Sequence, residues 1–180
     1  VSEVFHCNFQ GRRPFIAIGS KHGIVVGAGI HWNLPNIAIK RMLWSNPKVI
    51  WGGEVILNFP ITKELSQDLF SSKERQLRLG SSNWMLDLIA APGMEKGAVA
   101  KLGKRDKRRL FVNPHLKKPT VFTGSVFRKV RGGFISQNAP DFIPGPEDLK
   151  DVQGDNHKLP FEDILLAWAL ACSTHMNGVA

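Results

Sequence analysis

The chain of 180 residues contains no tyrosine, only two cysteines and no apolar run of the ~18 residues that a membrane-spanning helix needs. The scarcity of cysteine excludes a scaffold stapled by several disulfides, because Cys7 and Cys172 can form at most one bridge. No basic-then-apolar leader opens the sequence, so no signal peptide is predicted. The first residue is valine, which favours a processed chain or a domain excised from a longer protein.

The two cysteines lie near opposite ends of the sequence. We interpret them as buried thiols in a reducing compartment rather than as a long-range disulfide, which predicts an intracellular protein, cytoplasmic or nuclear. Hydrophobic residues make up 43% and charged residues 22% of the chain, as in ordinary globular proteins. A chain of this length can bury one sizeable core, so we expect a single domain over residues 1–180.

Local patterns predict an α+β fold, in which a few helices pack on a mostly antiparallel sheet. Residues 15–32 indicate a hairpin that turns at Lys21-His22-Gly23, since glycine readily adopts the positive φ of tight turns. Gly27 and Gly29 in its second strand indicate a bulge or a close backbone approach. The other expected strands are 3–9, 49–59, 109–112, 120–130 and 133–137. Three helices are expected: a short one that begins near Asn33 or Asn36 and ends at Trp44, and two that span 62–79 and 160–176.

The last of these helices is apolar around its whole circumference. This pattern predicts either a central place in the core or a surface for self-association or a protein partner. Before it, residues 140–158 form an acidic segment rich in proline and glycine, which we expect to be an exposed loop.

Acidic residues are almost missing from residues 101–132, where eleven of the chain's 24 Lys and Arg residues accompany a single acid, Asp106. The whole chain carries a formal charge of +9, so its positive excess is concentrated in this basic segment. Lysines and arginines displace counterions from phosphates, and the interleaved phenylalanines could stack on bases. The predicted phosphate contacts are Lys104, Arg105, Lys107, Arg108, Arg109, Lys117, Lys118, Arg128, Lys129 and Arg131.

These features favour a non-enzymatic module that binds the phosphate backbone of RNA or DNA within a larger assembly, without a metal or another cofactor. An anionic membrane surface or an acidic protein partner would satisfy the same charge and stays an alternative. A structural, matrix-like protein that assembles with itself is a further alternative. Trp32 and Trp51 are possible stacking platforms for bases, although core positions suit them better, and His22 and His115 are interpreted as surface groups.

An enzyme acting on nucleic acid is the main rival, and one pattern suggests a nuclease. Pro140-Asp141 followed by Glu147-Asp148-Leu149-Lys150 resembles the signature of metal-dependent nucleases. The resemblance implies two carboxylates holding a divalent cation and a lysine orienting the attacking water. The pattern lies in a segment broken by proline and glycine, whereas such sites are built on strands, so we prefer a chance resemblance.

A second pattern suggests a methyltransferase. Residues 86–93, LDLIAAPG, resemble the first motif of class I methyltransferases. The resemblance implies a strand that ends in a glycine turn against S-adenosylmethionine, with Asp87 as part of the site. Met94-Glu95 stands where that motif usually has a further glycine, and we prefer a short amphipathic helix stopped by Pro92-Gly93.

A zinc site is a weaker possibility. Cys172 and His175 lie three residues apart and would share one face of a helix, while His6 and Cys7 supply two more ligand types. The usual pairs of cysteines two residues apart are missing, so no metal site is predicted.

Overall fold

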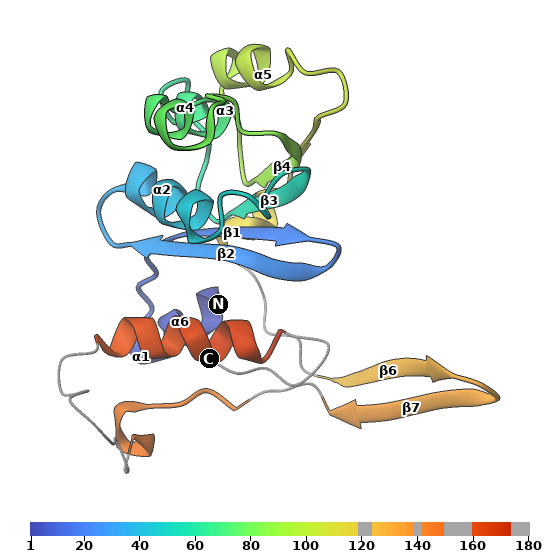
Figure 1. Ribbon diagram of the computed structural model, residues 1–180. Coiled ribbons are helices and arrows are strands. Elements are labelled where there is room, and N and C mark those ends of the chain that lie inside the picture. The colour runs from blue at the N-terminus through green and yellow to red at the C-terminus, as the bar shows by residue number, and fades with distance from the viewer. Residues whose placement is uncertain (119–123, 139–141, 150–159, 174–180) are drawn as a thin grey trace. The chain divides into compact units, whose positions relative to one another are not determined.

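The structure is a computed structural model that describes residues 1–118, 124–138, 142–149 and 160–173 (Figure 1). The chain forms two compact units, each described here by itself. Residues 13–118 make up what we call the sheet unit, and residues 3–12 with residues from 119 onward make up what we call the hairpin unit. The prediction that 1–180 acts as a single domain stays a prediction.

The sheet unit is built on a mixed sheet with the strand order β2-β1-β3-β4-β5. β1 (Phe15–Lys21) runs antiparallel to β2 (Ile24–His31) and to β3 (Gly53–Leu57). β3, β4 (Leu86–Ala91) and β5 (Arg109–Val112) are parallel to one another. Because parallel neighbours need a long crossover connection, helices lie between these strands in the sequence.

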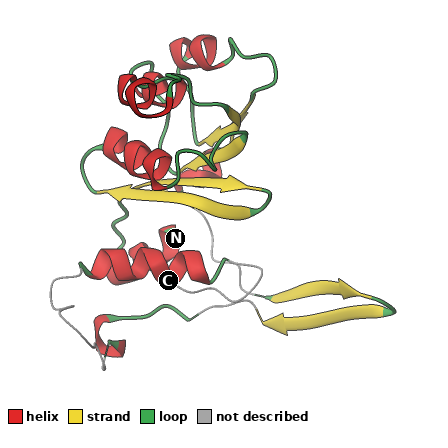
Figure 2. Ribbon diagram, viewed as in Figure 1, coloured by secondary structure: helices red, strands yellow, loops and turns green. Residues whose placement is uncertain are grey.

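Four α-helices, α2 to α5, belong to the sheet unit, and Figure 2 colours all helices of the chain red. α2 (Pro35–Ser45) packs on β1 and β2, while α3 (Leu65–Phe70) and α4 (Lys73–Leu79) connect β3 to β4. α5 (Lys96–Leu102) connects β4 to β5 and packs against α3. α2, α3 and α5 share one hydrophobic cluster with alternate strand residues, so these three helices cover one face of the sheet.

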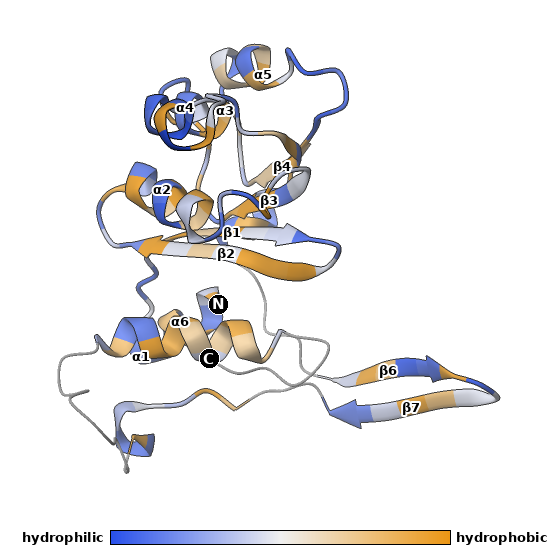
Figure 3. Cartoon of the chain, viewed as in Figure 1, coloured by the Kyte–Doolittle hydropathy of each residue, from blue (hydrophilic) through white to orange (hydrophobic). Residues whose placement is uncertain are grey.

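The hairpin unit contains α1 (Ser2–Asn8), the antiparallel pair β6 (Ser125–Val130) and β7 (Gly133–Asn138), the short 3-10 turn η2 (Pro146–Asp148), and α6 (Phe161–Ala171). Side-chain contacts tie its parts together. The Asn8 amide donates to the carbonyl of Pro144 at 3.0 Å, and the rings of Phe142 and Trp168 meet edge to face at 5.6 Å. The hydrophobic colouring of α6 in Figure 3 agrees with the apolar composition of this helix.

The α+β class is confirmed, and three of the five strand pairings are antiparallel. The predicted hairpin over residues 15–32, the strands at 109–112 and 133–137 and a C-terminal helix are also confirmed. That helix, α6, contributes no residue to the core cluster of the sheet unit. The acidic segment is described only at residues 142–149, and Asp141, Lys150 and His175 lie outside the described residues.

Two predicted elements are wrong in type. Residues 3–9 form most of α1 rather than a strand, because Phe5 and Phe9 stack one helical turn apart with ring centroids at 5.9 Å. Residues 86–91 form β4 rather than a helix, because a parallel strand buried inside a sheet reads as a short apolar run. Both cysteines are free but exposed, so their predicted burial is also wrong. In the part of the chain that is described, no helix is long and apolar enough to span a membrane.

The two glycines in β2 allow α2 to lie directly against the sheet. A Cβ added at Gly29 would fall 2.2 Å from the carbonyl oxygen of Ala38, and one at Gly27 would fall 2.3 Å from that of Met42. Both obstacles are backbone atoms of α2, which cannot move aside as a flexible side chain would. The predicted close backbone approach is therefore confirmed, and the missing side chains set the distance between helix and sheet.

Replacing Gly29 with alanine should lower the free energy of unfolding by about 1–3 kcal/mol, because the new methyl group forces α2 away from β2. Gly93→Ala is the matched control, since its added Cβ would meet only Pro60 at an ordinary 3.6 Å. The control should change stability by less than about 0.5 kcal/mol. Urea unfolding followed by circular dichroism would measure both, and equal effects would contradict the close approach.

Candidate functional site

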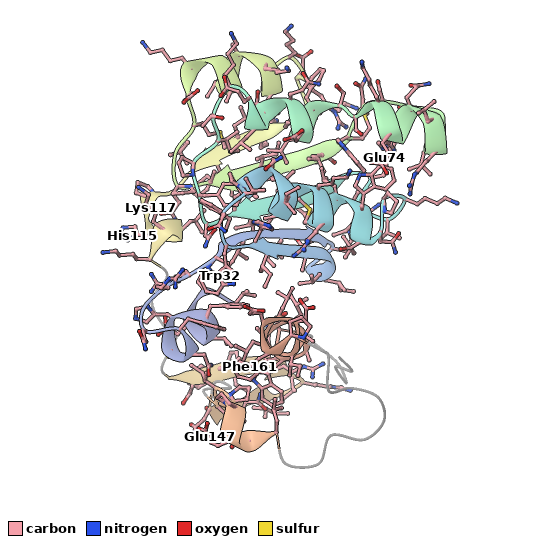
Figure 4. The ribbon with its side chains drawn as sticks, turned by 90° about the vertical axis from the view of Figure 1, so that its left-hand side faces the viewer. Trp32, Glu74, His115, Lys117, Glu147 and Phe161 are labelled. Atoms are coloured by element: carbon pink, nitrogen blue, oxygen red, sulfur yellow. The ribbon has the colours of Figure 1, made fainter. Side chains whose placement is uncertain are left out.

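The predicted phosphate-binding residues are divided between the two units. Seven of them, from Lys104 to Lys118, lie in the sheet unit between α5 and the residue that directly follows the turn η1 (Pro114–Lys117), and three lie in β6 and the tip that follows it. Figure 3 shows the connection after α5 as strongly hydrophilic. Figure 4 shows Lys117 close to His115 on η1, with both side chains at the surface.

Arg108 differs from the other six basic residues because it is buried, with only 6% of its surface exposed. Its guanidinium donates hydrogen bonds to the carbonyl oxygens of Trp84, Leu86 and Leu102 at 3.0, 3.0 and 3.1 Å. Burial lowers the pKa of Arg108, and the positive charge of Arg105 lowers it further. Arg108 therefore joins the start of β4 to the end of α5 inside the fold.

The carboxyl ends of the parallel strands form one edge of the sheet, where ligands bind in many α/β folds. Here the polar groups that follow the strands are occupied by the chain itself. The Asn58 side chain accepts from the amide of Ile16 and donates to the carbonyl of Pro14. Glu95 accepts from the amide of Lys63 at 2.8 Å. These groups fix backbone geometry, so this edge is the weaker candidate.

The opposite edge, where β1 ends and where β3 and β4 begin, carries the better candidate. The β1–β2 turn places Lys21 and His22 here, and Lys21 Nζ donates to the carbonyl of Trp51 at 2.6 Å. His22 has φ +56°, a left-handed conformation that a residue with a side chain seldom adopts. Backbone strain of this kind is concentrated at functional sites in proteins.

A second group of charges, those of Asp87 and Arg105, lies near Trp51-Gly52 at the same edge. A Cβ at Gly52 would lie 3.5 Å from Asp87 Oδ2, and the Gly52 amide donates to the carbonyl of Met85 at 2.6 Å. Asp87 in turn forms an ion pair with Arg105 at 3.0 Å. The indole of Trp51 is 48% exposed. We call the set of Lys21, His22, Trp51, Asp87 and Arg105 the turn cluster.

A cavity of about 500 Å³ lies between α2 and α3–α4, and Glu74, one of its lining residues, is labelled in Figure 4. Of its four charged lining residues, two are paired with each other. Lys40 forms an ion pair with Glu74 at 3.1 Å, and Glu74 also pairs with Arg78 at 3.1 Å. Burial raises the pKa of Asp68, against a smaller opposing effect of Lys40. These pairings explain the charges as surface stabilisation, so the turn cluster remains the better site.

The turn cluster can perform proton transfer and stabilise negative charge. An imidazole has one nitrogen that can accept a proton and one that can donate, so His22 can act as a base or an acid. The ammonium of Lys21 is held in place and can stabilise an oxyanion that develops beside it. An exposed indole offers a flat surface for a planar heterocycle. The described residues contain no group of three or more metal-ligating side chains.

Comparison with known proteins decides the family. A model of the AICARFT/IMPCHase bienzyme family matches residues 4–180. The chain belongs to the AICARFT/IMPCHase bienzyme family.

Several curated relatives carry the description bifunctional purine biosynthesis protein PurH. The Caulobacter vibrioides protein is 26% identical over 171 residues, which cover 92% of this chain and 29% of the relative. A Lactococcus lactis protein is 25% identical over 138 residues, which cover 75% of this chain and 24% of the relative. The Dictyostelium discoideum protein is 26% identical over 146 residues, which cover 78% of this chain and 25% of the relative. The chain thus spans between a quarter and three tenths of the length of these relatives.

Family membership overturns the function predicted from charge. The chain belongs to the AICARFT/IMPCHase bienzyme family, whose curated relatives are described as purine biosynthesis proteins, and the predicted RNA- or DNA-binding module, with nucleic acid as its partner, is wrong. The alternative predictions of a nuclease or a methyltransferase acting on nucleic acid are wrong for the same reason. The methyltransferase pattern did locate a real strand and turn, since β4 ends before Pro92-Gly93, but the family is a different one.

Sequence reasoning considered the members of the turn cluster separately, with Arg105 as a phosphate contact, and did not join them. The turn was predicted from Gly23, and His22 was taken for a surface group. Trp51 was weighed as a stacking platform, and Asp87 as part of another motif. Only the antiparallel pairing of β1 with β3, and the parallel pairing of β3 with β4, bring these positions to one edge.

Changing Arg108 to methionine should lower the free energy of unfolding by at least about 3 kcal/mol, because three buried carbonyls lose their donor. Arg109→Met is the matched control, since that neighbouring side chain is exposed and should matter by less than about 0.5 kcal/mol. Chemical unfolding of both variants measures the difference. Similar small effects for both would mean that Arg108 acts at the surface.

Proposed function

We propose that the turn cluster of this chain acts in purine synthesis where a nitrogen atom attacks a formyl carbon. The family name joins an AICAR transformylase to an IMP cyclohydrolase. A transformylase moves a formyl group from a donor to an amino group. Closing the six-membered ring of IMP joins a second nitrogen to that formyl carbon and releases one water molecule. Both reactions therefore share an attack of nitrogen on a formyl carbonyl.

Both reactions need the same two services from the protein. A base must accept the proton that the attacking nitrogen loses, and a positive group must stabilise the carbonyl oxygen as it gains negative charge. The observation that carries the proposal is the β1–β2 turn, which presents His22 in a left-handed backbone conformation directly after the anchored Lys21. In the proposed roles, His22 accepts the proton and Lys21 stabilises the oxygen.

The neighbouring groups suit a planar, anionic substrate. Trp51 would stack on the heterocycle, and the guanidinium of Arg75 lies 5.7 Å from the centre of that indole. Asp87 would hold the substrate's amino or amide hydrogens, and Arg105 orients this carboxylate through its ion pair. AICAR and IMP are both nucleoside monophosphates, so the net positive charge of the chain favours their approach.

An intracellular setting agrees with purine biosynthesis and with the two free cysteines. A location in the cytoplasm, rather than the nucleus, is part of this proposal. The proposal concerns the contribution of this chain, which matches only part of each curated relative, and either of the two named activities would use the same site.

Replacing His22 with glycine separates function from stability. Glycine adopts positive φ without strain, so the free energy of unfolding of the variant should exceed that of the wild type by about 0.5–1 kcal/mol. Loss of the acid–base group should lower turnover about 10²-fold or more. Turnover of AICAR with a formyl donor, and of IMP with water, should be measured on the protein as the cell makes it, alongside thermal unfolding.

Gln10→Gly is the matched control, because Gln10 is the other described residue with a side chain at positive φ, at +51°. It should gain similar stability and keep full turnover. A His22→Gly protein that stays stable and fully active in both reactions would refute the role of His22. Wild-type protein that turns over neither compound would refute the proposed function as a whole.

A further inference from the structure

A cavity of about 260 Å³ lies beside the turn cluster, between the end of α3, the start of β4 and the loop that follows α5. Its walls are of two kinds. Phe70 and Trp84 supply aromatic surfaces, and Lys104, Arg105 and Arg108 supply three positive charges. Asn83 and Met85 complete the lining. The first part of the basic segment thus lines one open cavity, which shares Arg105 with the turn cluster, whereas the proposed chemistry at the turn uses neither Lys104 nor Arg108.

The positive charge around this cavity exceeds the negative charge. Among the described residues, Asp87 is the one carboxylate that forms an ion pair with any of the three basic side chains, through Arg105. Three cations and one anion leave an excess of two positive charges. Arg108 is buried in this environment, and burial with the charge of Arg105 lowers its pKa. Buried cations without equal counter-charge are destabilised, so a bound anion would be favourable.

The donors are held in place before any ligand arrives. Three of the five N–H groups of Arg108 bond to backbone carbonyls, which leaves two. Arg105 donates to the carbonyl of Leu86 at 3.2 Å and to Asp87, which leaves three. The ammonium of Lys104 is exposed at the mouth and has no hydrogen-bond or ion-pair partner within the described residues. Fixed donors of this kind bind oxyanions well, because little conformational freedom is lost on binding.

We propose that this cavity is a binding site for a phosphate dianion, either as the free ion or as the phosphate end of a mononucleotide. A dianion would balance the excess of two positive charges. Its oxygens could accept from the fixed guanidinium groups of Arg105 and Arg108 while Lys104 closes the mouth. This proposal stands apart from the chemistry proposed for the turn cluster, since it requires binding alone.

The test is calorimetric titration of the chain with inorganic phosphate at low ionic strength, for wild type, Lys104→Met and Lys107→Met. The two lysines are exposed and three residues apart, and the substitutions remove the same charge, but only Lys104 lines the cavity. Phosphate affinity should fall about tenfold or more in the Lys104→Met protein and stay nearly unchanged in the Lys107→Met protein. Both variants should unfold like the wild type, since neither lysine makes a contact that holds the fold.

Further titrations with IMP and with inosine identify the source of the phosphate. Binding of IMP, weakened by Lys104→Met and absent for inosine, would place the phosphate of a nucleotide in the cavity. Binding of inorganic phosphate with no competition from IMP would assign the site to the free ion. Wild-type protein that binds neither, or equal losses in the two lysine variants, would overturn the proposal. Because no turnover is measured, these outcomes are independent of whether the turn cluster is catalytic.

Discussion

The guanidinium of Arg108 holds together the part of the sheet unit on which both proposed sites depend. It donates to three carbonyls at the start of β4 and the end of α5, and no other described side chain joins these two elements so directly. Arg105 bonds to one of the same carbonyls, that of Leu86, and then reaches Asp87. The position of the carboxylate in the turn cluster thus depends on backbone groups that Arg108 orients. A buried arginine that binds three carbonyls is a structural element, although in the sequence it is one of eleven basic residues in a single segment.

This arrangement explains how a concentrated positive charge can misidentify a function. Counterion displacement depends on the number of phosphates contacted, so a polymer needs basic side chains along an extended surface. In the structure the segment is divided among several roles: Arg108 lies inside, Lys104 and Arg105 line a cavity, Lys117 lies on η1, and three residues lie in another unit. A sequence records charge per residue but not whether the charges converge on a point or follow a line. Binding a mononucleotide requires positive charges that converge on one phosphate, whereas binding a nucleic acid requires positive charges along a line of phosphates.

Local patterns predicted those elements whose causes are local. The β1–β2 hairpin followed from a turn with Gly23, and α4 ends at Gly80 in the left-handed conformation that a helix end favours. The close packing of α2 on β2 could be expected from two glycines within a strand. α1 and β4 could not be assigned in this way, because a short run of apolar residues fits either a helix or a strand. Their type was decided by partners far away in the sequence. β4 lies between β3 and β5, and Phe9, which directly follows α1, lies near Phe161 with ring centroids 6.4 Å apart.

The turn cluster shows the same limit at the level of function. Its members come from three places, residues 21–22, 51 and 87 with 105, and each has an ordinary explanation when considered alone. A histidine in a tight turn usually means an exposed loop, yet this one occupies a backbone conformation that an asparagine or a glycine would adopt more easily. The strain persists because Lys21 is bonded to the carbonyl of Trp51, which fixes the turn against the start of β3. Gln10 shares this conformation, so strain alone does not mark a site; the proposal depends on the placement of the imidazole directly after the anchored Lys21, which no composition records.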